Sequence, residues 1–106
     1  MEAKKIINEE EFNNAIENGV SLIDFNAPWC APCRAQGPIV QQLSKKFEER
    51  AVIAEMNIDE NQQTAMELRI QSIPTLAIFK NGKEVQRFIG LQSQDTLSAA
   101  IEKMLV

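Results

Sequence analysis

Two apolar segments, separated by a stretch with helical periodicity, constrain the fold of this chain more than any other feature. Residues 20–25 are apolar on both alternating sets apart from Ser21 and Asp24, which is typical of a central strand covered on both faces. A second buried strand is expected over residues 51–58. Because a helix separates them, the two strands should be parallel and joined by a right-handed crossover. This unit places the chain in the α/β class.

Amphipathic helices should cover the faces of the sheet. The connecting helix is expected over residues 33–49, with a kink at Pro38. A last helix should begin after the cap residue Ser93. The apolar side chains on one face are Ile39, Val40, Leu43 and Phe47 in the first of these helices and Leu97, Ala100, Ile101, Met104 and Leu105 in the second. Such stripes indicate core contacts rather than a cofactor site.

The N-terminal segment predicts one further strand and one further helix. The strand is expected over residues 4–8. Asn8 and Glu11 are spaced as a capping pair for the helix that follows, and Gly19 should end that helix. Its apolar face would consist of Phe12, Ala15 and Ile16.

The second half of the chain predicts a short helix and a hairpin. The helix is expected over residues 59–70, with Asp59 and Gln62 as a weak capping pair. The dipeptide Asn81-Gly82 lies between strands expected over residues 75–79 and 84–89, and it is the strongest short hairpin signal. These two strands should therefore be antiparallel, which makes the sheet mixed.

Length and charge narrow the function classes. The whole chain, residues 1–106, should form one domain, because no linker, repeat or low-complexity tract divides it. A net charge of -4 with scattered Lys and Arg argues against nucleic-acid binding. The first residues lack the apolar stretch and cleavage site of a secretory signal, and no run approaches the ~18 apolar residues of a membrane span. We therefore expect a cytoplasmic protein without membrane contacts.

The two cysteines, Cys30 and Cys33, are separated by two residues. A structural disulfide closing so small a loop would contribute about 2 kcal/mol, against about 4.7 kcal/mol for a 100-residue loop. A zinc site needs four ligands, and the chain has no His, so only a metal shared between two chains remains possible. Reversible dithiol chemistry fits the spacing better. Cys30 should lie at a helix N-terminus, which stabilises a thiolate, with Cys33 one turn later.

Residues 29–34 read Trp-Cys-Ala-Pro-Cys-Arg, which resembles the active-site motif of the thioredoxin family. The similarity continues along nearly the whole chain. It includes Asp24-Phe25, Pro38, Asn57-Ile58-Asp59, Ile73-Pro74-Thr75, Phe79-Lys80-Asn81-Gly82 and Gly90. The resemblance implies a thioredoxin fold, with a central mixed five-stranded sheet flanked by four helices on both faces.

The resemblance also implies a function and its residues. Cys30 would be the nucleophile, Cys33 the resolving thiol, and Asp24 a buried carboxylate that moves the proton of Cys33. The alternative for Asp24 is a polar strand residue whose carboxylate is satisfied by hydrogen bonds. A cis peptide bond would join Ile73 to Pro74. The residues implied in substrate binding are Trp29, Ala31, Pro32, Ile73, Pro74, Thr75 and Gly90. The chain would reduce protein disulfides as a monomer, accept electrons from a thioredoxin reductase, and need no cofactor or metal.

Two residues beside the cysteines have two interpretations each. Trp29 would either plug the site as a partly buried aromatic or contact substrate directly. Arg34 would either be a solvated residue of the first helical turn or help to stabilise a thiolate.

Three positions depart from the family pattern. Ala31 replaces Gly, Asn26 stands where an aromatic residue is common, and Glu55 stands where a Lys near the buried Asp is common. These changes affect the expected rates, potential and partner range, while the reaction class rests on the unchanged cysteines and prolines. The absence of His between the cysteines favours a reductant over a strong oxidant or isomerase. The alternative function is a redox-independent binding module that uses the same surface.

Overall fold

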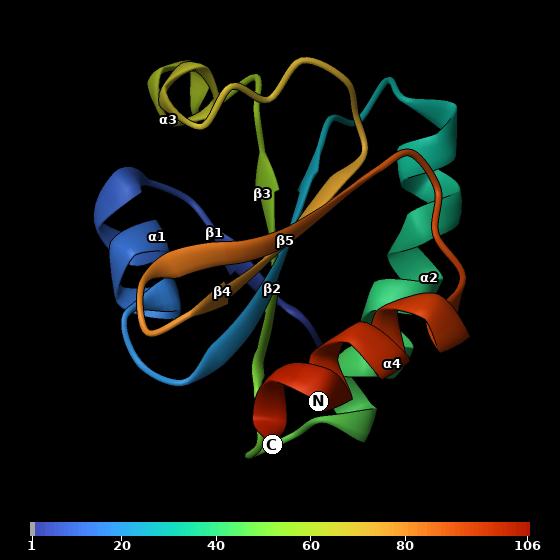
Figure 1. Cartoon of the computed structure of the whole chain (residues 1–106). Coiled ribbons are helices and arrows are strands. Elements are labelled where there is room, and N and C mark those ends of the chain that lie inside the picture. The colour runs from blue at the N-terminus through green and yellow to red at the C-terminus, as the bar shows by residue number, and fades with distance from the viewer. Residues whose placement is uncertain (1) are drawn as a thin grey trace.

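The computed structural model describes residues 2–106. In this part of the chain, strands and helices alternate until a final hairpin and helix (Figure 1). The elements are β1 (Lys4–Ile6), α1 (Glu9–Ile16), β2 (Val20–Asn26), α2 (Ala31–Lys46), β3 (Val52–Asn57), α3 (Gln62–Glu67), β4 (Thr75–Lys80), β5 (Lys83–Ile89) and α4 (Gln94–Leu105).

The strands form one five-stranded sheet in the order β1-β3-β2-β4-β5. β3 runs parallel to both β1 and β2. β4 runs antiparallel to β2 and to β5. The predicted mixed sheet with a parallel strand-helix-strand unit is therefore confirmed. The central strand β2 is buried from Val20 to Phe25, as its apolar pattern predicted.

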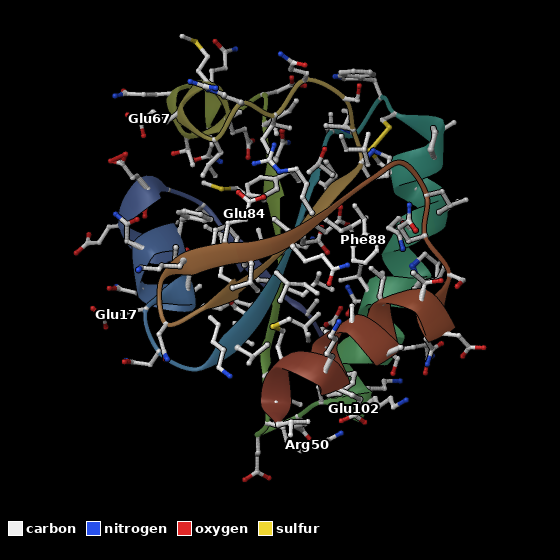
Figure 2. All side chains as sticks on the ribbon, in the orientation of Figure 1. Glu17, Arg50, Glu67, Glu84, Phe88 and Glu102 are labelled. Atoms are coloured by element: carbon white, nitrogen blue, oxygen red, sulfur yellow. A yellow bond between two sulfur atoms is a disulfide. The ribbon has the colours of Figure 1, made fainter. Side chains whose placement is uncertain are left out.

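Helices cover both faces of the sheet (Figure 1), with α1 and α3 on one side and α2 and α4 on the other. Alternate residues of each central strand supply the two cores. Leu22 packs with Val40, Leu43 and Leu97 on the side of α2 and α4. Ile23 and Phe25 pack with Phe12 and Ile16 on the side of α1. On the edge strand β5, Phe88 joins the first of these cores (Figure 2).

Two of the three predicted helix caps are confirmed. The Asn8 side chain accepts a hydrogen bond from the backbone N–H of Glu11 at 2.8 Å, and the Glu11 carboxylate accepts one from the N–H of Ile7. Ser93 caps α4 by accepting from the N–H of Thr96 at 3.1 Å. These caps satisfy N–H groups that no helical carbonyl can reach.

The cap predicted for the short helix α3 is wrong. The helix begins at Gln62 and its cap position is Asn61, which makes no side-chain cap hydrogen bond. Asp59 instead accepts a hydrogen bond from the Trp29 indole. The Asp59 carboxylate, which the local pattern assigned to the helix cap, therefore binds a residue distant in sequence.

The β4–β5 hairpin turns at Asn81-Gly82, as predicted. Both residues have positive φ, +51° and +87°, which is the requirement of a type I′ turn. The Asn81 side chain also accepts a hydrogen bond from the N–H of Gly19 at 2.8 Å. This contact ties the hairpin to the connection between α1 and β2.

The connecting helix α2 is shorter at its C-terminal end than predicted and begins two residues earlier. It continues through Pro38, where a kink stays a prediction. Within residues 2–106, no helix combines the length and apolar character that crossing a bilayer requires.

Candidate active site

A disulfide joins Cys30 to Cys33 at the N-terminus of α2, directly after the connection from β2. Cys30 is the N-cap residue of the helix, and its Sγ accepts a hydrogen bond from the N–H of Cys33 at 3.3 Å. Each cysteine is only 5% exposed. The predicted position of Cys30 at unpaired helix N–H groups is therefore confirmed, and this position favours negative charge on sulfur.

The loop before β4 faces the disulfide. Cys30 Sγ lies 3.8 Å from the carbonyl oxygen of Ile73. Ile73 and Ile58 pack against the buried cluster of Ala27, Cys30 and Cys33. The peptide bond between Ile73 and Pro74 is cis, as the family resemblance implied. The carbonyl of Pro74 accepts a hydrogen bond from Gly90 at 2.8 Å.

Gly90 and Thr75 hold this loop against the end of the sheet. Gly90 adopts φ +91°, a conformation that residues with a Cβ rarely adopt. Thr75 is buried, pairs with Phe25 and Ile89 in the sheet, and donates its hydroxyl to the carbonyl of Ser72 at 2.5 Å. The structure thus brings residues 73–75 and Gly90 to the disulfide.

Trp29 is 67% exposed, so it does not plug a core. Its indole N–H donates to the Asp59 carboxylate at 2.8 Å, which fixes one edge of the ring while the rest of its surface stays open. Of the two interpretations of this residue, a solvent-facing aromatic beside the cysteines fits better than a buried plug.

Ala31, Pro32 and Arg34 form the exposed first turn of α2. Proline is suited to this turn because it needs no N–H partner there. The Arg34 guanidinium donates to the carbonyl of Pro28 at 3.1 Å. This contact braces the loop that enters the helix.

Asp24 is fully buried at 0% exposure, on the β2 face that α2 and α4 cover. Among residues 2–106, no donor lies within hydrogen-bond distance of either carboxylate oxygen. Burial, with the charge of Glu55 as a second cause, raises the pKa of Asp24 to about 7. Asn26 lowers the pKa in part, although its amide donates to Glu55 at 3.3 Å rather than to Asp24. A carboxyl in this state is half protonated near neutral pH.

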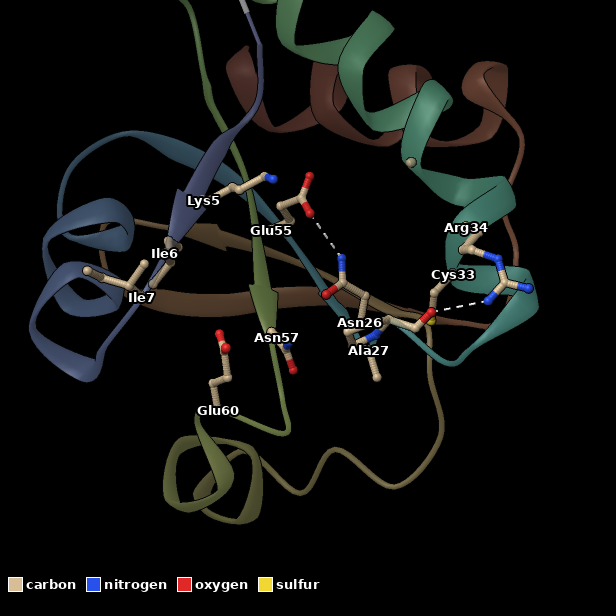
Figure 3. Close-up of a pocket in the computed structure, with 12 residues that line it drawn as sticks. Lys5, Ile6, Ile7, Asn26, Ala27, Cys33, Arg34, Glu55, Asn57 and Glu60 are labelled. Atoms are coloured by element: carbon tan, nitrogen blue, oxygen red, sulfur yellow. Dashed lines mark hydrogen bonds between the residues drawn. The ribbon is translucent and has the colours of Figure 1, made fainter.

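A pocket of about 400 Å³ lies on the other side of the first turns of α2 (Figure 3). Cys33, Gly37 and Arg34 line it from the helix, and Glu55 and Asn57 line it from β3. Cys30 faces the loop at Ile73, whereas Cys33 lines this pocket. The disulfide thus lies between the loop at Ile73 and this pocket.

Sequence reasoning missed two supporting residues. Gln36 of α2 is fully buried; its amide donates to the carbonyl of Gln92 at 3.0 Å and accepts from the N–H of Gln92 at 2.8 Å. This pair anchors the segment after Gly90 to α2. The available signal was the position of Gln36, one turn before Val40 on the apolar face. The contact between Asp59 and Trp29 had no local signal.

This arrangement supports reversible thiol–disulfide exchange. The disulfide joins residues three positions apart at a helix N-terminus. In such a pair, one sulfur can react with an external partner and the second can then re-form the intramolecular disulfide. A buried carboxyl with a pKa near neutrality lies on the strand that leads into the motif. Within residues 2–106, no group of three or more metal-ligating side chains comes together.

Comparisons with known proteins agree with this chemistry. The family model described as Thioredoxin matches residues 3–103. A thioredoxin from Staphylococcus aureus (strain Mu50 / ATCC 700699) is 36% identical over 99 residues, which are 93% of this chain and 95% of the relative.

Solved thioredoxin structures share the fold. A mutant thioredoxin from Halobacterium salinarum NRC-1 superposes with a TM-score of 0.92 at 33% identity, over 99% of this chain and 92% of that one. A thioredoxin from Plasmodium falciparum gives a TM-score of 0.87 at 30% identity, over 95% of this chain and 98% of that one. The chain therefore belongs to the thioredoxin family, and its Cys30–Cys33 pair is the redox centre of a thioredoxin-type protein-disulfide oxidoreductase.

Proposed function

We propose that this chain works as a reductant of protein disulfides, with Cys30 as nucleophile and Cys33 as resolving thiol. The observation that carries the proposal is the disulfide at the N-terminus of α2, whose Cys30 sulfur faces the substrate side at Ile73. Exposure does not separate the two cysteines, since each is 5% exposed; the assignment is supported by the position of Cys30 as the N-cap residue of α2, where its Sγ accepts a hydrogen bond from the N–H of Cys33.

The reaction proceeds in two exchanges. The Cys30 thiolate attacks one sulfur of the substrate disulfide, forms a mixed disulfide and releases the first substrate thiolate. The Cys33 thiolate then attacks Cys30 Sγ, closes the intramolecular disulfide and releases the second substrate thiolate. One electron pair passes from the dithiol to the substrate, and the two leaving thiolates take up the two protons that the dithiol gives up.

Asp24 acts in the second exchange. Cys33 must lose its proton before it attacks, and a carboxyl with a pKa of about 7 accepts a proton at neutral pH. The buried position of Asp24 beneath α2 supports this role, since it lies on the same face of the sheet as the helix that carries Cys33.

Substrate would bind across the exposed surface around Cys30. Ile73 lies outside the sheet ladder just before β4, so its backbone is available to an extended substrate segment. Exposed apolar side chains of Trp29, Ile89 and Leu91 flank the site. The residues proposed for this surface are Trp29, Ala31, Pro32, Ile73, Pro74, Thr75 and Gly90.

Membership of the thioredoxin family supports our proposals for the partners and the cellular location of the chain. We place the chain, as a monomeric single domain over residues 1–106, in the cytoplasm. A thioredoxin reductase would return it to the dithiol state, and protein disulfides would be its substrates.

The test is an insulin-reduction assay driven by NADPH and a thioredoxin reductase, with the Cys30→Ser, Cys33→Ser double variant as the matched control. The wild-type chain is expected to turn over repeatedly and the double variant to show no reduction above background. If the double variant retained the biological activity of the chain in cells, the redox function would be wrong and the redox-independent binding module would replace it.

A further inference from the structure

Three charged residues lie in one row across the sheet, behind the disulfide. The strand register pairs Asp24 of β2 with Glu55 of β3, and Glu55 in turn with Lys5 of β1. Paired residues of neighbouring parallel strands point to the same face. The row therefore runs from a fully buried acid, through a half-buried one, to an exposed cation.

Glu55 is the member of the acid pair that solvent can reach. It lines the pocket of about 400 Å³, together with Cys33 of α2, whereas Asp24 does not line it. Figure 3 shows the Glu55 carboxylate above β3, with Lys5 on one side and Asn26 on the other. The pocket thus connects solvent to Glu55, and Glu55 adjoins Asp24 through the strand register.

Polar contacts hold Glu55 in this position. One carboxylate oxygen accepts a hydrogen bond from the Asn26 amide at 3.3 Å, and the other accepts one from the Gln41 amide of α2 at 3.4 Å. The remaining charged groups that line the pocket are Arg34 on α2 and Glu60 on the connection after β3. Neither of these two is paired with Asp24 in the sheet.

We propose that Glu55 exchanges the proton of Cys33 with solvent by way of Asp24, so that the two carboxyl groups work as an inner and an outer member of one pair. This inference rests on the proposed role of Asp24. Cys33 gives its proton to ionised Asp24 and becomes the attacking thiolate. The protonated Asp24 then passes the same proton to the Glu55 carboxylate, which releases it to water in the pocket, and Asp24 is ionised again.

Glu55 touches neither sulfur, so it is a positioning residue that acts through Asp24. Its negative charge disfavours ionisation of Asp24, and replacing it by a neutral amide should make Asp24 ionise at lower pH. A purely structural role, through the contacts to Asn26 and Gln41, would leave the pH dependence in place. Gln at this position can keep a hydrogen-bonding side chain of the same size.

The experiment measures resolution by Cys33 directly. A mixed disulfide between Cys30 and glutathione is formed at about pH 4, and after a jump to a series of higher pH values the release of glutathione is followed. The variants are Glu55→Gln, the control Glu60→Gln in the same pocket, and Asp24→Asn. Carboxyl chemical shifts of Asp24 are followed against pH in the reduced protein.

For Glu55→Gln we expect the plateau rate of resolution at high pH to fall, because the outer proton acceptor is lost. The midpoint of the resolution profile and the Asp24 titration should also move to lower pH by roughly half a unit or more, a threefold change in the protonation ratio, because a negative charge is removed. Glu60→Gln should leave the plateau rate and both midpoints close to wild type. In the Asp24→Asn background, Glu55→Gln should change the profile no further, because its effect passes through Asp24.

Two other outcomes are distinguishable. If Asp24→Asn slows resolution but Glu55→Gln leaves the plateau rate unchanged, with or without a shift of the midpoint, the inference about Glu55 is wrong and the proposed role of Asp24 stands. If Asp24→Asn leaves the rate and its pH profile unchanged, the role of Asp24 fails and the inference fails with it.

Discussion

The carboxyl group of Asp24 is buried in the folded chain, where ionisation is unfavourable, and exposed to water in the unfolded chain, where it is not. Burial first, and Glu55 second, raise its pKa from 3.8 to about 7. The folded chain therefore binds this proton more tightly than the unfolded chain does. Below about pH 4 the group is protonated in both states, and stability is lost as the pH rises from there to about 7.

Asp24→Asn should remove this pH dependence. From about pH 4 to about pH 8, the stability of the Asn variant relative to wild type should increase by roughly 4 kcal/mol, since each unit of pKa shift corresponds to about 1.4 kcal/mol. The check is urea unfolding of both oxidised proteins across this range. A stability difference that does not change with pH would contradict the raised pKa.

Cys33→Ser should trap mixed disulfides between target proteins and Cys30. The attack by Cys30 remains possible, but the internal thiol that releases the substrate is lost. Mass spectrometry after mild denaturation should find adducts on Cys30 in this variant. The control is Cys30→Ser, which should accumulate none on Cys33; adducts only in that control would reverse the assignment of the two thiols.

Among the helices and strands, sequence patterns correctly predicted the caps and turns that depend on residues close together in the sequence. The Asn8 cap, the Ser93 cap and the turn at Asn81-Gly82 all depend on residues within a few positions of one another. Asp59 was predicted wrongly because its partner, Trp29, lies 30 residues away. The apposition of a carboxylate on β3 to Asp24 depends on strand register, which neither strand encodes alone.

In the candidate site, too, the features set by local sequence were predicted from the residues, and those set by tertiary packing were not. The spacing of Cys30 and Cys33 and the helix that follows them indicated the redox pair without any structure. The placement of Ile73 and Gly90 at the disulfide came from the family resemblance, because tertiary packing brings these loops together. No periodicity could indicate it.

The hairpin turn gives a test at this scale. Gly82 has φ +87°, so Gly82→Ala should destabilise the fold by about 1 kcal/mol or more, because a Cβ is strained in this conformation. Gly37 in α2 is the matched control: a Cβ there meets nothing within 4 Å, and Gly37→Ala should stabilise by roughly 0.5–1 kcal/mol. Thermal unfolding of both variants measures the difference. Equal effects would contradict the assignment of the turn.

Across the whole molecule, the two cores share the strands of one sheet, so they should unfold together. Leu43→Ala on the α2 side should cost roughly 2–5 kcal/mol, and Phe12→Ala on the α1 side roughly 3–5 kcal/mol. Each variant should still unfold in one transition, with the same midpoint by far-UV circular dichroism and by calorimetry. Two separate transitions would show that the chain is not a single cooperative unit.

The small exposed fraction of Cys30 sets which disulfides this chain can reach. Only 5% of its surface is open, at the N-terminus of α2 and opposite the Ile73 carbonyl. A bond held inside the core of another folded protein cannot approach this sulfur, whereas one on a loose loop or a partly unfolded segment can. We therefore expect the chain to select its targets by their mobility, sparing the cross-links that hold intact proteins together and acting on those that local unfolding presents.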